Sequence, residues 1–401
     1  MTAFQVKRAF KYRCYPSDAQ AAELSRTFGC VRKVYNLALA ARTDAWVRQE
    51  RLNYAQTSAM LTQWKKSEEL AYLSEVSSVP LQQALRHLQG AFVSFWDKRS
   101  RYPRFKSRKK SRASAEYTRS AFRFRDGKLT LAKMTDPLVI VWSRPLPEGA
   151  EPTTVTVSRD AAGRWFVSLL CDDTPAAMPS TTAAVGIDAG ITSLVTLSTG
   201  EKITNPRHER KDRVRLAMAQ RVLSRRTKGS ANWEKARRKV AKVHARIADR
   251  RRDFLHQLTT RLVCENQTLV IEDLTVRNIV KNRTLARAVS DASWSELRMM
   301  LEYKCAWYGR KLIAVDRWFP SSKLCSACGA IAASMPLTVR IWTCDCGAVH
   351  DRDVNAAKNI LAAGLAVTVC GDGVRPQRST PERQRSAKQK TQPAREGITA
   401  H

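Results

Sequence analysis

The sequence lacks any apolar run that approaches the roughly 20 residues of a membrane-spanning helix, and residues 1–11 lack the long apolar core of a signal peptide. Acidic residues are also scarce. Against 70 Lys and Arg stand 36 Asp and Glu, so the formal net charge is +34. A compact body with so much unbalanced charge repels itself unless a polyanion neutralises it. The composition therefore predicts a cytoplasmic, nucleoid-associated partner of nucleic acid, with a solvated basic surface or an anionic membrane as the alternatives.

The sequence also lacks the regularly spaced cysteines that are typical of a disulfide framework. Of the ten cysteines, six are scattered singly, as buried core residues usually are. The other four form two tight turns, and four thiolates from two such turns suit one structural Zn²⁺; they are Cys325, Cys328, Cys344 and Cys346. Because the second turn is one residue shorter than the first, His350 or Asp345 could substitute as a ligand. A degraded finger held by packing alone is the other reading.

The first half of the chain alternates short strands with helices. A strand-like run at 4–15 precedes a helix opened by Ser17 and Gln20 as a capping box, and helices are predicted near 55–66 and after Pro80. A basic run then leads to short strands, two of them joined by an Asp-Gly turn. This succession predicts a small β-barrel over 1–14 and 115–176, interrupted by a helical module over 15–114.

The second half has a different pattern. Beyond a linker rich in small residues, strands alternate with long helices, which predicts an α/β unit. Residues 211–262 form a heavily basic helical hairpin broken near Lys228-Gly229-Ser230. The polar, basic stretch 369–401 is predicted to be a disordered tail.

Three acids stand where secondary structure could deliver them to one site. Asp188 lies in an apolar strand (VGIDAG), Glu272 ends another (LVIED), and Asp353 opens an Ala-rich helix (DRDVNAAKNI). Capping of a turn or a helix is the structural alternative for each. In combination, three carboxylates could hold two Mg²⁺ about 4 Å apart, the arrangement that hydrolyses phosphodiesters. Strand alternation sends the neighbouring Asp273 to the opposite face, where we expect it to cap the next turn.

These acid motifs, with PSSKLCSACG between the last two and KYRCYPSDAQ near the start, resemble the TnpB family of transposon-encoded nucleases related to type V CRISPR effectors. The resemblance covers nearly the whole chain. It implies an α/β multi-domain protein with an RNase H-like (RuvC) nuclease domain over 181–320 and 350–368. Its first and fourth strands would lie side by side, a zinc-finger insertion would occupy 321–349, and the β-barrel would be the wedge next to a helical recognition module.

The same resemblance implies an RNA-guided DNA endonuclease of an insertion sequence. Its partners would be a guide RNA from the transposon end and double-stranded target DNA cut next to a short motif, and the protein would be a monomer or weak dimer. Pairing would read the sequence while the protein reads shape and backbone. Candidate nucleic-acid contacts are Tyr54, Gln82, Arg104, Lys106, Arg225 and Arg226.

Three other functions compete with this interpretation. A guide-bound repressor that does not cleave would have lost one of the three acids, and all are present. A single-strand transposase would need a His-apolar-His motif, which is absent. A zinc-finger regulator explains the cysteines and the charge but leaves the acids without a role.

Overall fold

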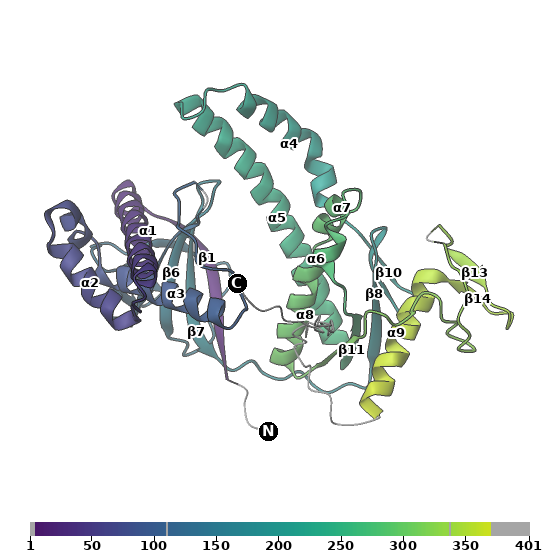
Figure 1. Cartoon of the computed structure of the whole chain (residues 1–401). Coiled ribbons are helices and arrows are strands. Elements are labelled where there is room, and N and C mark those ends of the chain that lie inside the picture. Colours follow the sequence, from purple (N-terminus) through teal and green to yellow (C-terminus); the bar gives the residue numbers. More distant parts are fainter. Residues whose placement is uncertain (1–4, 110, 337, 370–401) are drawn as a thin grey trace, which may run out of the picture.

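The computed structural model describes residues 5–109, 111–336 and 338–369 and shows an α/β chain of several units. A helical module packs with one β-sheet, a second sheet lies beyond it with its own helices, and a long helical hairpin rises between the two (Figure 1). Within the described residues, no helix is long and apolar enough to cross a membrane. The tail predicted for 369–401 lies outside the described residues, except for Val369 at the end of a helix.

The predicted helices of the first half are present as α1 (Asp18–Val47), α2 (Tyr54–Lys66) and α3 (Ser78–Trp96), with a 3₁₀ turn η1 (Glu68–Ser74) before α3. The Ser17 capping box is confirmed: the Gln20 N–H donates to the Ser17 hydroxyl at 3.3 Å, and the Ser17 N–H donates to the Gln20 side chain at 3.0 Å. Helix α3 begins two residues before Pro80. A proline is tolerated there because the first N–H groups of a helix have no partner within it.

The first sheet is antiparallel, with the order β2-β6-β7-β1-β5. Its strands are β1 (Val6–Tyr15), β2 (Ala113–Thr118), β5 (Val139–Val141), β6 (Pro152–Arg159) and β7 (Trp165–Asp173), and a 3₁₀ turn η2 (Arg119–Ala121) follows β2. The predicted Asp-Gly hairpin joins β3 (Phe122–Arg125) to β4 (Lys128–Leu131), with positive φ at both turn residues. The wedge-like barrel stays a prediction, because among the described strands β2 and β5 form two edges.

The second sheet has the order β10-β9-β8-β11-β12. It comprises β8 (Ala184–Ala189), β9 (Ser193–Leu197), β10 (Lys202–Thr204), β11 (Thr268–Glu272) and β12 (Lys311–Val315). Strands β8, β11 and β12 are parallel to one another, whereas β9 is antiparallel to β8 and β10. Apolar side chains of α5 (Ala231–Glu265) and α8 (Trp294–Tyr308) cover one face, and α9 (Arg352–Val369) covers the other. The sheet is therefore the middle of three layers.

The basic hairpin consists of α4 (His208–Ser224) and α5, and the break predicted near Gly229 is confirmed. Short helices α6 (Val276–Ile279) and α7 (Ala286–Ala292) lead into α8, and β13 (Ile341–Thr343) pairs with β14 (Val349–Asp351) beside α9. Arg164, just before β7, forms an ion pair with Asp249 on α5, and the Arg8 guanidinium lies 4.5 Å from the Trp307 ring centre. These contacts join the first sheet to the helices of the second half.

Candidate metal centre and nucleic-acid interface

Two of the three predicted acids lie on adjacent parallel strands and on the same face. Strands β8 and β11 pair with Ile187 opposite Ile271, so Asp188 and Glu272 are the next residues in register. Ile187 and Ile271 both belong to the core under α5 and α8. Because side chains alternate along a strand, Asp188 and Glu272 face α9 instead.

Helix α9 brings the third acid to the same place. A Cβ at Gly186 would lie 2.1 Å from the carbonyl oxygen of Ala357, so the helix rests directly on this strand. The step from Gly186 to Asp188 is about 6.6 Å along a strand, which equals about four helical residues. Counting four residues back from Ala357 along the antiparallel helix leads to Asp353.

The electrostatics of Asp188 reflect this convergence. Burial is the largest cause, and the carboxylates of Glu272 and Asp353 add to it, so that the pKa of Asp188 rises from 3.8 to about 7; Arg352 acts in the opposite direction. Asp188 still keeps some exposed surface. A buried carboxylate beside two others is costly unless a cation compensates, so the donor set fits hard divalent metal ions.

The neighbours of the other two acids hold them in position. The Ser321 hydroxyl donates to Glu272 Oε1 at 2.5 Å, and Arg340 donates to Asp353 Oδ1 at 3.3 Å. Asp351 has a different role from the three acids. Its carboxylate accepts hydrogen bonds from the N–H groups of Asp353 and the next residue, both at 3.1 Å, and forms an ion pair with Lys202 at 2.6 Å. Asp351 is therefore the cap of α9, which leaves Asp353 available for a ligand.

Within the described residues, the group of three or more His, Cys, Asp or Glu side chains close enough to hold a metal ion is the cysteine cluster. The three carboxylates do not form such a group in this structure, so a metal site at Asp188, Glu272 and Asp353 stays a prediction.

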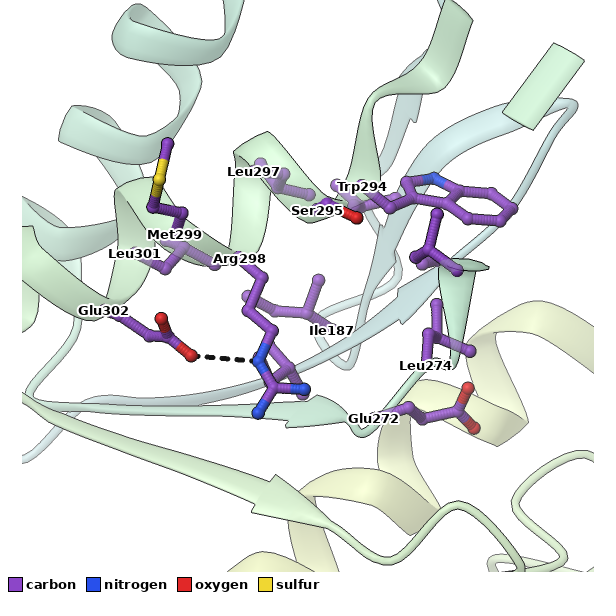
Figure 2. Close-up of a pocket in the computed structure, with 14 residues that line it drawn as sticks. Ile187, Glu272, Leu274, Trp294, Ser295, Leu297, Arg298, Met299, Leu301 and Glu302 are labelled. Carbon is purple, nitrogen blue, oxygen red and sulfur yellow. Dashed lines mark hydrogen bonds and ion pairs between the residues drawn. The ribbon is translucent and has the colours of Figure 1, made fainter. Parts of the chain in front are cut away.

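The expectation that Asp273 caps a turn is wrong. Its carboxylate accepts hydrogen bonds from Arg298 on α8 and from Arg317 after β12, because strand alternation turns it toward these two guanidinium groups. Those hydrogen bonds outweigh the effect of burial and lower the pKa of Asp273. Figure 2 shows the cavity on this side of the sheet, about 340 Å³ in volume, with Arg298 bound to Glu302 and the Glu272 carboxylate directed away from Arg298.

The four cysteine sulfurs form a compact cluster, with their atoms within 4.8 Å of one another. Cys325 Sγ lies 3.8 Å from Cys346 Sγ, and Cys328 Sγ lies 3.7 Å from Cys344 Sγ. Four sulfurs at about 2.3 Å from a central zinc ion are about 3.8 Å apart in a regular tetrahedron. The cluster therefore fits Zn²⁺.

The shorter second turn still delivers its sulfur. In the first turn the Gly329 N–H donates to the Cys325 carbonyl, four residues back, and in the second the Gly347 N–H donates to the Cys344 carbonyl, three residues back. Both glycines have positive φ, which a glycine adopts without strain. The shorter turn thus closes as a tighter version of the first. His350 Nε2 lies 3.0 Å from Cys325 Sγ and is an additional neighbour of the cluster rather than a substitute for Cys346.

A large basic groove lies between the first sheet, α1 and α5. Its volume is about 1450 Å³, and three carboxylates and twelve Lys or Arg side chains line it. The basic residues are Lys11, Arg13, Arg26, Arg32, Arg108, Lys109, Arg112, Arg159, Arg164, Arg237, Arg238 and Arg252. Burial, followed by the nearby Arg112 and Arg252, lowers the pKa of Lys11. The excess positive charge suits a nucleic-acid backbone.

The six predicted nucleic-acid contacts lie elsewhere. Four are exposed: Gln82 on α3, Arg104 in the basic loop, and Arg225 and Arg226 at the tip of the α4–α5 hairpin. The other two have contacts within the chain. The Lys106 ammonium lies 3.8 Å from the centre of the Tyr35 ring, and the hydroxyl of Tyr54 accepts from Arg86 at 3.4 Å. For all six residues a nucleic-acid contact stays a prediction.

Sequence reasoning missed the groove and the Ser321 contact. The groove residues come from six separated segments. The basic run and the basic hairpin stood out in the sequence, but nothing in the sequence showed that they lie beside each other and beside the first sheet. Ser321 stands in PSSKLCSACG, which drew attention only through its cysteines, although a serine between two acid motifs was the available signal.

Comparison with known proteins shows the family. Three family models match: "Probable transposase" of the IS605 OrfB type over 166–283, "Cas12f1-like, TNB domain" over 294–360, and "Helix-turn-helix domain" of the OrfB type over 1–51. In a cryo-EM structure of the Cas12f1–sgRNA–target DNA complex, the fold is similar over 89% of this chain and 98% of that chain, with a TM-score of 0.57 and 12% identity.

Two curated relatives align over nearly their full length. A Streptomyces pristinaespiralis protein named "Putative RNA-guided DNA endonuclease" is 75% identical over 98% of both chains. An Escherichia coli K12 protein of the same designation, InsQ, is 33% identical over 92% of this chain and 94% of its own. With these alignments and the OrfB models together, the chain belongs to the TnpB (IS605 OrfB) family.

Proposed function

We propose that this chain is an RNA-guided DNA endonuclease that hydrolyses phosphodiester bonds with two Mg²⁺ held by Asp188, Glu272 and Asp353. The observation that carries the proposal is geometric: Asp188 and Glu272 are adjacent in register on the paired strands β8 and β11, and α9, whose first turn contains Asp353, rests on β8. Burial and the two neighbouring carboxylates raise the pKa of Asp188, and acids assembled at this cost need a cation to compensate them. The sheet order, with its first and fourth strands adjacent, supports an RNase H-like (RuvC) domain.

The chain's own residues would orient the reaction. Metal ions at these acids supply an activated water and stabilise the leaving oxygen. The Ser321 hydroxyl fixes one carboxylate oxygen of Glu272, which leaves the other oxygen free to bind. Asp351 caps α9 by accepting hydrogen bonds from the first N–H groups of the helix, and these bonds hold the backbone of Asp353 in place. One structural Zn²⁺ at the four cysteines would hold the finger beside this helix.

The partners proposed are a guide RNA from the transposon end and a double-stranded DNA target. The twelve basic side chains of the groove support a long polyanionic partner. The two full-length relatives are named for RNA-guided DNA cleavage, and the solved structure with the similar fold contains an RNA and a target DNA. The helical module is the proposed reader of the short flanking motif.

The test begins with protein purified from cells that carry its native locus, followed by sequencing of the RNA that copurifies. DNA matching that RNA should be cut in the presence of Mg²⁺. Asp188→Ala should abolish cutting and leave RNA and target binding nearly unchanged, since the groove is separate from the acids. Cutting by this variant would remove the assignment, and target binding without cutting by the wild-type protein would favour a repressor instead.

A further inference from the structure

The loop after β12, residues 316–323, lies beside the acids and is fixed on both sides. Before its apex, Arg317 donates to Asp273 Oδ2 at 2.7 Å and to the Thr275 hydroxyl at 2.9 Å, which fastens the loop to the turn that follows β11. After its apex, Ser321 donates to Glu272, and the Ser321 carbonyl accepts from Asn359 on α9 at 2.8 Å. The loop is therefore held to two of the elements that carry the acids.

Between these attachments one large aromatic side chain is left in solvent. Trp318 is 85% exposed, the highest value among the large apolar side chains of the described residues. Its backbone N–H donates to Asp316 at 2.8 Å, so the main chain is ordered by its own turn. The next residue, Phe319, packs instead against the small core beneath α9. Within the described part of the chain, no ring or cation contact is recorded for the indole of Trp318.

The position of Trp318 relative to the acids can be bounded from the chain. Trp318 lies three positions before Ser321, so their Cα atoms are at most about 11 Å apart. The Ser321 hydroxyl is itself 2.5 Å from the Glu272 carboxylate. An indole within that reach can meet a nucleotide close to the scissile phosphate.

We propose that Trp318 is a stacking platform for a base of the unpaired DNA strand that enters the carboxylate site. This rests on the proposed nuclease function and assigns a substrate-positioning residue to it. An indole face is open only to a base that has left its duplex, so the platform selects single-stranded substrate at the site. Stacking of one base on an aromatic side chain contributes about 1–3 kcal/mol, which corresponds to about 5–150-fold in binding.

The experiment uses the guide-RNA complex and a single-stranded DNA oligonucleotide that pairs with the guide and continues beyond it as an unpaired overhang, with 2-aminopurine placed in turn at each overhang position near the cut. Trp318→Leu should raise KM for cleavage by at least about 5-fold and leave kcat nearly unchanged, whereas Trp318→Phe should retain most of the wild-type behaviour. At one position the 2-aminopurine fluorescence should be quenched by the wild-type complex and recover with Trp318→Leu.

A matched control is Trp46→Leu, which removes an indole that is 65% exposed on α1, far along the chain from the acids. Although α1 belongs to the module proposed to read the flanking duplex motif, a single-stranded target has no such motif, so Trp46→Leu should leave KM unchanged. An abasic nucleotide at the quenched position should raise KM of the wild-type protein as much as Trp318→Leu does. Combining the abasic strand with Trp318→Leu should raise KM no further than either change alone. Equal KM for wild type and Trp318→Leu, or additive effects with the abasic strand, would overturn the platform. If the wild-type protein does not cut at all, the nuclease proposal fails, while quenching measured with Asp188→Ala still decides the role of Trp318.

Discussion

Replacing Asp188 by asparagine keeps the shape of the side chain and removes its negative charge. In the folded, metal-free protein the pKa of Asp188 is about 7, against 3.8 for the same group in an unfolded chain. Each unit of difference corresponds to about 1.36 kcal/mol, so ionised Asp188 destabilises the fold by up to about 4 kcal/mol. Asparagine does not ionise, and Asp188→Asn should therefore be more stable than the wild type when no divalent metal is bound.

The pH dependence follows from the sign of the shift. Because the folded pKa is raised, the unfolded chain releases this proton first, and the wild-type protein loses stability as pH rises from about 4 to about 7. Above pH 7 the loss is complete. The advantage of Asp188→Asn should thus be about 4 kcal/mol at pH 8 and less than half of that at pH 5.

Thermal unfolding in magnesium-free buffer measures this difference, and omitting chelators keeps zinc at the cysteines. For a domain of this size, 1 kcal/mol shifts Tm by about 2–4 °C, so the upper limit at pH 8 is about 8–16 °C. Added Mg²⁺ should raise Tm for the wild type and not for Asp188→Asn. Asp351→Asn, which changes an exposed ion pair next to the site, should lower Tm slightly at both pH values. An Asp188→Asn protein no more stable than wild type at pH 8 would refute the reasoning.

Three further outcomes are expected. Elemental analysis of protein purified without added metal should find about one zinc per chain, and Cys346→Ser should lose it; under about 0.3 zinc in the wild type contradicts the four-cysteine site. Gly186→Ala should displace α9 from β8 and abolish cutting, because the new Cβ would lie 2.1 Å from a carbonyl oxygen of α9. The control Gly29→Ala on α1 places its Cβ where no atom lies within 4 Å, and it should raise Tm slightly. Equal Tm values for the two variants would count against the packing of α9 on Gly186. Ser321→Ala should raise the Mg²⁺ concentration for half-maximal cutting by about 10-fold, and an unchanged magnesium titration would show that the hydroxyl is dispensable.

Local patterns were sufficient to predict most of the elements and the three acids. Strand alternation separated Glu272 from Asp273, and the helix that begins with DRDVNAAKNI supplied the third carboxylate. The capping box at Ser17 and the Asp-Gly hairpin were equally local, since each depends on residues within four positions of one another. Such features follow from propensity and hydrogen bonding alone.

Contacts between distant segments could not be predicted in the same way. The ammonium of Lys106 lies over the ring of Tyr35, 71 positions away along the chain, and burial lowers its pKa. The basic run that contains Lys106 gave no sign of this contact, because charge composition shows how many basic side chains a segment has but not which of them pack within the fold; the nucleic-acid contact predicted for Lys106 stays a prediction. Asp273 was misassigned for a related reason, because its two arginine partners are 25 and 44 residues away.

Helix α9 explains why the acids, the finger and the loop after β12 form one structure. Its buried Asn355 donates to the Leu324 carbonyl at 2.7 Å and accepts from the Ser326 N–H at 2.9 Å, which fixes the first cysteine turn. One turn later Asn359 donates to the carbonyls of Leu324 and Ser321. Buried amides are stable only when such partners are present. The helix that delivers Asp353 therefore depends on the finger for its polar contacts, and a structural zinc ion would stabilise the carboxylate site without touching it.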